Sequence, residues 1–172
     1  YTAAPESGLP ASATTGSGML SILGGTYTGY GSKSLAANAW SVGGGWVMDV
    51  NAAGYSNLKF SAKMRSSATG PGAFNLQYSI DSGATWTTIE GSDITIASTS
   101  LSDTYSNFAL PEILNNCAFQ LRVTISSAIA QNPDKGDFAS GGTSNINNIA
   151  IIGTTSGEGG GSTTSTCAAV TP

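Results

Sequence analysis

The sequence contains no histidine. Without an imidazole, the chain lacks Ser-His-Asp and Cys-His triads, the commonest general base and the commonest metal ligand. Charge is also scarce, because charged residues make up 9% of the 172 residues and the formal net charge is −4. These two shortages exclude the commonest hydrolase mechanisms and disfavour any partner that is held mainly by charge.

Cations are few and scattered along the chain, at Lys33, Lys59, Lys63, Arg65, Arg122 and Lys135. Nucleic-acid binding needs a concentrated basic surface that displaces counterions. The same scarcity disfavours acidic polysaccharides and anionic membrane surfaces. No apolar run approaches the ~20 residues of a membrane-spanning helix. We therefore predict a neutral partner, with no nucleic acid and no membrane span.

Redox, metal and catalytic motifs are equally sparse. The two cysteines, Cys117 and Cys167, lack CxxC spacing. The sequence does not decide whether they form a disulfide, which would join the C-terminal segment to the folded module. The ten acidic residues show no recognisable pair of the kind that glycoside hydrolysis uses. We predict that the chain is not an enzyme and needs no cofactor, with structural calcium bound by aspartate and carbonyl oxygens as the open exception.

Composition divides the chain into three parts. Residues 1–18 are small and polar with two prolines, as expected of a flexible leader. Residues 154–172 have the Gly, Ser and Thr content of a linker, which ordinarily joins a module to other modules of a larger protein. The folded module is expected over residues 19–153.

Within the module, apolar residues recur with a period of two, and each segment is bounded by Gly, Pro, Asn, Asp or Ser. No comparable window shows a capped helical stripe. Since several half-apolar strands must each bury one face against another layer, we predict an all-β, two-sheet antiparallel β-sandwich of jelly-roll-like form. The expected strands are Met19 to Leu23, Trp46 to Ala52, Leu58 to Ser66, Phe74 to Ile80, Asp93 to Ser98, Ala118 to Ser126 and Asn148 to Gly153.

One hairpin has a recognisable motif. SIDSGATW, from Ser79 to Trp86, matches the Asp-box pattern Ser-x-Asp-x-Gly-x-Thr-Trp. Asp81 is placed to accept backbone N–H groups across the turn, Gly83 to take a positive φ, and Trp86 to pack under the turn. The motif predicts a hairpin and says almost nothing about a ligand.

A longer resemblance covers residues 24–152. It rests on YTGYGSKSLAANAW, GGGWVMDV, SIDSGATW, YSNFALP, FQLRVTISS and GGTSNINNIAI. In this order they resemble the jelly-roll-like β-sandwich modules that accompany secreted bacterial nucleases, glycan-degrading enzymes and surface proteins, and carbohydrate-binding modules in general layout. The low-charge composition is similar to that of starch-adherence proteins of gut Firmicutes. The resemblance implies a non-catalytic, extracellular glycan-binding or adhesion domain.

Aromatic residues gather in the first third of the module. Neutral sugars present apolar C–H faces, so a binding site needs exposed aromatic rings beside amide or carboxylate groups. Tyr27, Tyr30, Trp40 and Trp46 form the densest aromatic region, and Gly43 to Gly45 would let a ligand approach the backbone. The competing interpretation makes Trp46 and Trp40 core residues and the tyrosines strand-face residues.

A second candidate region is the polar segment from Ala130 to Asn145, between two expected strands. Loops of this length are usually functional or mobile. Its candidate ligand-binding residues are Gln131, Asn132, Lys135 and Asp137. A solvated loop whose Asn and Asp side chains only form turns is the alternative.

These features together predict a secreted or cell-surface bacterial carbohydrate-binding module. Its expected ligand is a neutral polysaccharide, starch or another α-glucan first, because neutral glucans are bound by stacking and hydrogen bonds without cations. The alternative is an adhesive or spacer β-sandwich that contacts proteins. Exposed rings would favour the first function and buried rings the second.

Overall fold

The computed structural model describes residues 20–23, 26–31 and 34–155. The predicted leader, 1–18, lies outside this part of the chain, as do residues 156–172 of the predicted linker. Eleven strands and two short 3-10 helices are present in the described residues: β1 Leu20–Leu23, β2 Thr26–Gly31, β3 Ser34–Asn38, β4 Gly45–Asn51, β5 Tyr55–Ser66, β6 Ala73–Ser79, β7 Thr87–Thr88, β8 Ile94–Thr95, β9 Ser102–Ala109, η2 Glu112–Leu114, β10 Ala118–Ile125, η3 Pro133–Lys135 and β11 Ser144–Thr155.

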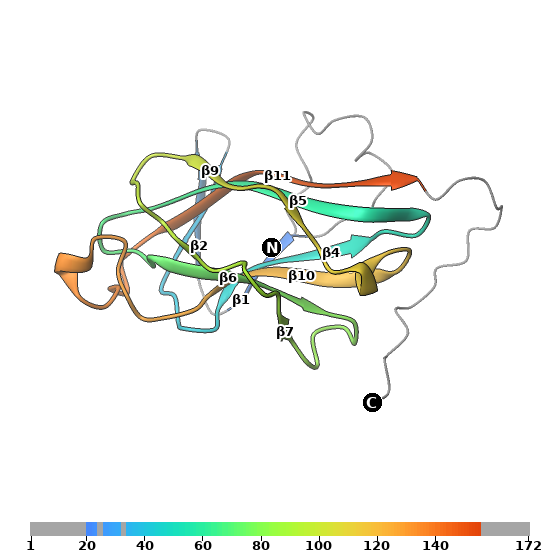
Figure 1. Ribbon diagram of the computed structural model, residues 1–172. Helices are drawn as coiled ribbons and strands as arrows, with labels where there is room; N and C mark the ends of the chain where they lie inside the picture. Colours follow the sequence, from blue (N-terminus) through green and yellow to red (C-terminus); the bar gives the residue numbers. More distant parts are fainter. Residues whose placement is uncertain (1–19, 24–25, 32–33, 156–172) are drawn as a thin grey trace.

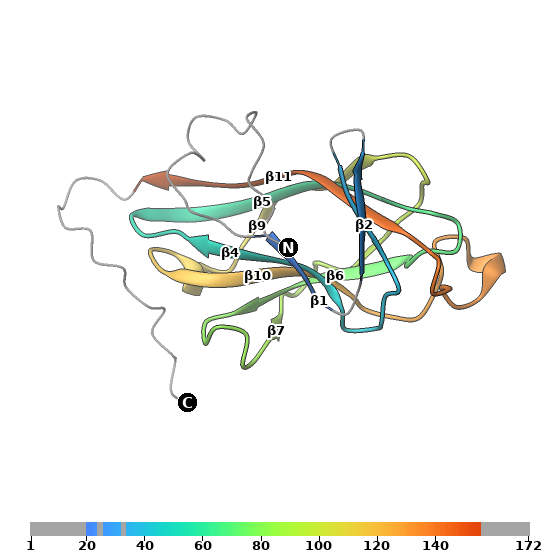
Figure 2. The ribbon, with the colours of Figure 1, turned by 180° about the vertical axis from the view of Figure 1, so that it is seen from behind.

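The strands form two antiparallel sheets that face each other, so the predicted β-sandwich is confirmed (Figures 1 and 2). Sheet A has the order β1-β4-β10-β6-β7, with β8 also paired to β6, and sheet B has the order β2-β3-β11-β5-β9. From β3 onward the chain crosses between the sheets, except where β6, β7 and β8 stay together in sheet A. This winding is a jelly roll, in which the last strand returns between β3 and β5.

Alternation of apolar and polar residues explains why these segments are strands. In β5 Leu58, Phe60 and Met64 are buried, whereas Lys59 and Arg65 next to them are exposed. Successive side chains of a strand point to opposite faces, so one face meets the other sheet and one meets solvent. The strand β10 follows the same rule, with its buried residues at Phe119, Leu121, Val123 and Ile125.

Trp46 and Trp40 lie in the core between the sheets. Trp46 has no exposed surface and Trp40 is 6% exposed, and their rings meet edge to face with centroids 5.3 Å apart. The Trp40 Nε1–H donates to the Ala37 carbonyl at 2.9 Å, while the Trp46 Nε1–H has no partner among the described residues. The prediction of Trp40 and Trp46 as exposed ligand platforms is therefore wrong, because apolar burial has drawn both rings inside.

Two other sequence predictions need adjustment. Asp93 to Ser98 contributes only the two residues of β8, Ile94–Thr95, because β8 forms only two residue pairs with β6, Phe74 with Ile94 and Ala73 with Thr95. The last strand, β11, extends to Thr155, two residues beyond the predicted module boundary at 153.

We expect Trp46→Ala to lower the free energy of unfolding by roughly 3 to 5 kcal/mol, the usual range for truncating a buried aromatic ring. Val42→Ala is the matched control, since Val42 is 53% exposed, and it should change stability by less than about 0.5 kcal/mol. Urea denaturation followed by circular dichroism measures both. Equal losses for the two variants would contradict the core position of Trp46.

Candidate functional site

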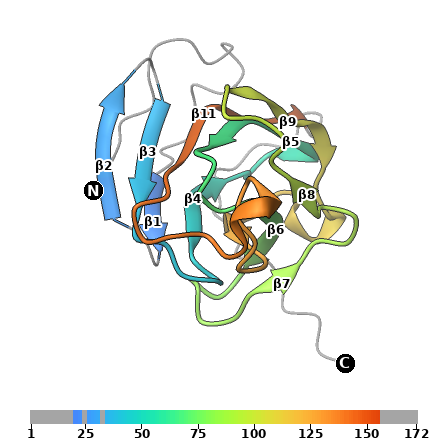
Figure 3. The ribbon, with the colours of Figure 1, turned by 90° about the vertical axis from the view of Figure 1, so that its left-hand side faces the viewer.

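The segment between β10 and β11, residues 126–143, lies at one end of the sandwich (orange in Figures 1 and 3). It is held to the β5–β6 connection by backbone hydrogen bonds. Gln131 N donates to Gly70 O at 2.7 Å, Asn132 N to Ala68 O at 3.1 Å, and Ala139 N to Thr69 O at 2.9 Å. The long polar segment is therefore built into the fold as an ordered loop.

Glycine permits this close contact between the two loops. A Cβ on Gly142 would lie 2.0 Å from the carbonyl oxygen of Thr69, and one on Gly72 would lie 2.5 Å from that of Ala130. Both positions exclude any side chain because the clashing atoms belong to the backbone. Backbone packing thus fixes where the 126–143 loop sits.

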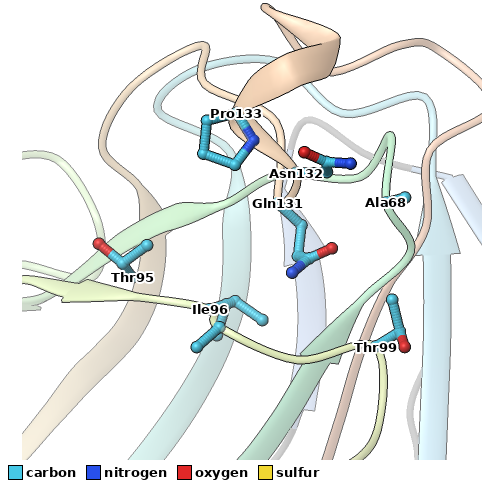
Figure 4. A pocket seen from close by; sticks show the side chains of 8 residues that line it. Ala68, Thr95, Ile96, Thr99, Gln131, Asn132 and Pro133 are labelled. Atoms are coloured by element: carbon cyan, nitrogen blue, oxygen red, sulfur yellow. The ribbon is translucent and has the colours of Figure 1, made fainter.

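A shallow depression of about 450 Å³ lies between this loop and the segment that follows β8. In Figure 4 the Gln131 side chain reaches from the loop backbone toward Ile96 and Thr99. The lining residues come from three separate parts of the chain, namely Ala68, Thr95, Ile96, Ala97, Thr99, Gln131, Asn132 and Pro133.

The lining combines apolar surface with neutral polar groups. Ala68, Ile96, Ala97 and Pro133 supply aliphatic contacts, and no charged side chain is among the lining residues. Asn132 Oδ1 accepts the N–H of Asp134 at 3.0 Å and caps η3, which leaves the Asn132 amide N–H groups for a ligand. Such a surface suits a small uncharged ligand with both C–H faces and hydroxyls.

Two of the predicted site residues, Gln131 and Asn132, line the depression. Lys135 and Asp137 are exposed on the same loop but do not line the depression. A part for Lys135 and Asp137 in ligand binding therefore stays a prediction.

Tyr27 and Tyr30 belong to β2, which pairs with β3 in sheet B. They thus lie on a strand and not in the loop that a binding platform was expected to occupy. Their side chains lie outside the described part of the structure. A ligand-binding role for Tyr27 and Tyr30 therefore stays a prediction.

The Asp-box hairpin between β6 and β7 has the predicted geometry. Asp81 accepts the Thr85 N–H at 2.9 Å and the Thr85 hydroxyl at 2.6 Å, and Gly83 has a φ of +87°. A Cβ on Gly83 would lie 3.5 Å from Cζ2 of Trp86, so the indole packs under the turn. Trp86 also stacks on the Arg122 guanidinium, with 4.1 Å from Cζ to the ring centroid.

Sequence reasoning missed the polar side chains on the outer face of sheet A. Gln77, Gln120 and Arg122 alternate with buried residues of β6 and β10, and Asp49 of β4 pairs in register with Gln120. The signal was present, since a period of two assigns each of these residues to the face opposite Leu76 and Leu121. These residues were not predicted because binding groups were expected only in loops.

Cys117 is buried and disulfide-bonded. The chain's other cysteine, Cys167, lies outside the described residues. Within the described ranges no cluster of three or more His, Cys, Asp or Glu side chains could hold a metal ion. The same ranges contain no helix with the length and hydrophobicity of a membrane-spanning helix.

Comparison with models of protein families found no family that matches the chain, and comparison with curated proteins found no significant relative.

We expect Gly142→Ala to destabilise the protein and to displace the 126–143 loop, because the new Cβ would overlap the Thr69 carbonyl. Gly141→Ala is the matched control, since a Cβ there would have no heavy atom within 4 Å. Thermal melting should show a lower Tm for Gly142→Ala only. A pair of variants with the same Tm as the native chain would disprove the close packing of the two loops.

The stability that Asp81 provides should disappear in acid. Hydrogen bonds from Thr85 and Ser79 lower the pKa of Asp81 to about 2 from its ordinary value of 3.8. Because the folded-state pKa is depressed, this contribution is present above the ordinary value and lost as the pH falls through about 2.

Asp81→Asn should therefore melt below the native chain at neutral pH, and the gap should narrow between about pH 4 and about pH 2. Asp134→Asn serves as control, because the exposed Asp134 carboxylate has no hydrogen-bond partner in the described ranges. Thermal melts at a series of pH values measure both. A gap independent of pH would contradict the role of the ionised carboxylate.

Proposed function

We propose that the chain is a non-catalytic carbohydrate-binding module that holds a neutral polysaccharide, with starch-type α-glucan as the first candidate. In this proposal it belongs to a secreted or cell-surface bacterial protein and keeps attached modules near their polymer. The jelly-roll sandwich supplies a rigid frame on which loops carry binding groups. The resemblance of residues 24–152 to glycan-binding modules supports the same function.

The observation that carries the proposal is the uncharged depression lined by Gln131 and Asn132. Aliphatic atoms of the exposed Ala97 and Pro133 offer contact to the C–H groups of a sugar ring, and the amides and threonine hydroxyls offer hydrogen bonds to its hydroxyls. Because the loop is fixed by backbone bonds, little order must be gained on binding. No carboxylate lines the depression, which favours binding over hydrolysis there.

One observation favours the alternative, an adhesive or spacer domain that contacts proteins. Trp40 and Trp46 are buried, and no aromatic side chain is among the lining residues of the depression. A sugar site without a stacking ring depends on hydrogen bonds and aliphatic contacts, so its affinity should be weak, in the ~mM to ~µM range. Under the alternative no glycan binds.

The test is calorimetry with maltooligosaccharides and affinity electrophoresis against the neutral polysaccharides starch, xylan, cellulose and mannan. Gln131→Ala should weaken glycan binding about three- to tenfold, the effect of one lost hydrogen bond. Lys135→Ala, on the same loop but outside the depression, should bind as the native chain does. Absence of retardation by every glycan, or unchanged binding in Gln131→Ala, would remove the support for this function.

A further inference from the structure

Arg122 lies on the outer face of sheet A, between the inward-facing residues Leu121 and Val123 of β10. The Trp86 ring covers one face of its guanidinium at 4.1 Å. A cation over an indole face is attracted by the ring quadrupole, and a planar guanidinium can also stack on it. The Asp-box hairpin therefore holds this arginine flat against the sheet.

A second contact fixes the guanidinium within its plane. Arg122 Nε donates to Gln77 Oε1 at 2.9 Å, and Arg122 Nη2 donates to the same oxygen. The Gln77 amide is itself oriented, because its Nε2 donates to Thr88 Oγ1 at 3.1 Å. One edge of the guanidinium is thus occupied by a neutral acceptor.

The other edge is free. Nη1 and the second hydrogen of Nη2 form the end fork of the guanidinium, and neither has a partner among the described residues. The one ion pair of the described part joins Lys63 to Asp103, so Arg122 has no carboxylate there. Arg122 is half-buried, and the lost hydration lowers its pKa. A partly buried cation without a counter-charge is costly, and a bidentate carboxylate matches its fork.

Hydrogen-bonding side chains, most of them neutral, surround this cation. Gln120 lies two residues before Arg122 on the same face and donates to Asp49 Oδ1 at 2.6 Å. Thr88 of β7 pairs with Gln77 on the side of β6 opposite to Arg122. The Asp49 carboxylate makes the face mixed in charge, which disfavours a dense polyanion such as nucleic acid. A sugar ring with a single carboxylate fits this surface, because the carboxylate pairs with the guanidinium and the ring hydroxyls bond to the neutral groups.

We propose that the Arg122 surface, formed by Gln77, Trp86, Thr88, Gln120 and Arg122, binds the carboxylate of a uronic-acid residue in a glycan. The carboxylate accepts two hydrogen bonds from the guanidinium fork, and the ring hydroxyls reach the flanking amide and hydroxyl groups. This goes beyond the proposed function, because the surface is built on β6, β7 and β10 and shares no residue with the depression. It needs one carboxylate, so the low overall charge does not oppose it.

The probe is oligogalacturonate, and its fully methyl-esterified form is the matched ligand without charge. Calorimetry should show binding of the acid and at least about tenfold weaker binding of the ester. The emission of Trp86 should change with the acid, since the other two tryptophans are buried. Absence of binding, or equal affinity for acid and ester, would overturn the proposal.

Arg122→Gln should weaken oligogalacturonate binding at least about tenfold. Arg122→Lys keeps the charge but lacks the fork, so its affinity for oligogalacturonate should lie between those of the native chain and Arg122→Gln. It replaces Arg122→Gln as the test variant if that substitution loosens the hairpin. Lys135→Gln is the control for loss of a positive charge elsewhere. Both Arg122 variants should keep the native Tm within a few degrees and the native affinity for maltooligosaccharides. Full affinity for the acid in Arg122→Gln, or its loss in Gln131→Ala instead, would contradict the inference.

Discussion

The packing of two sheets against a single apolar layer is the constraint on which the rest of the structure depends. From Leu58 onward, the inward positions of β5 are occupied by buried side chains, and so are those of β10 from Phe119 to Ile125. Trp46 fills part of the same layer with no exposed surface. With inward positions taken by the core, only the outer faces and the connecting loops are left for contacts with other molecules.

The central strands could be predicted from the sequence, because alternation is a local property. The predicted segment Ala118 to Ser126 matches β10 within one residue, and Leu58 to Ser66 matches β5 except for its first three residues. Strands β2, β3 and β9 were not predicted from alternation. The residues of β3 are mostly small, and β9 has a single buried residue, Tyr105, because it lies at the edge of sheet B. Their strand character comes from pairing with distant neighbours, which local patterns do not contain.

The candidate site was harder to predict for a related reason. Gln131 and Asn132 were identified from the polarity of their loop, but their neighbours Ala68 and Ile96 come from connections far away in the sequence. Trp40 follows β3 among small residues, where nothing local reveals that its ring reaches Trp46 in the core. Arg122 was recoverable, since its place in an alternating strand predicts an outward position. Its stacking on Trp86 requires the hairpin to fold back over β10, which the motif alone does not state.

The contact between the 126–143 loop and the β5–β6 connection, residues 67–72, separates the frame of the depression from its rim. The frame consists of main-chain hydrogen bonds and glycines that admit no side chain. The rim positions Thr95, Ala97 and Thr99 are exposed and belong to a segment outside those two loops. Side chains at the rim can therefore be exchanged while the underlying backbone keeps its shape. The fold is suited to diversification in a library, where ligand preference is varied one rim residue at a time without new demands on folding.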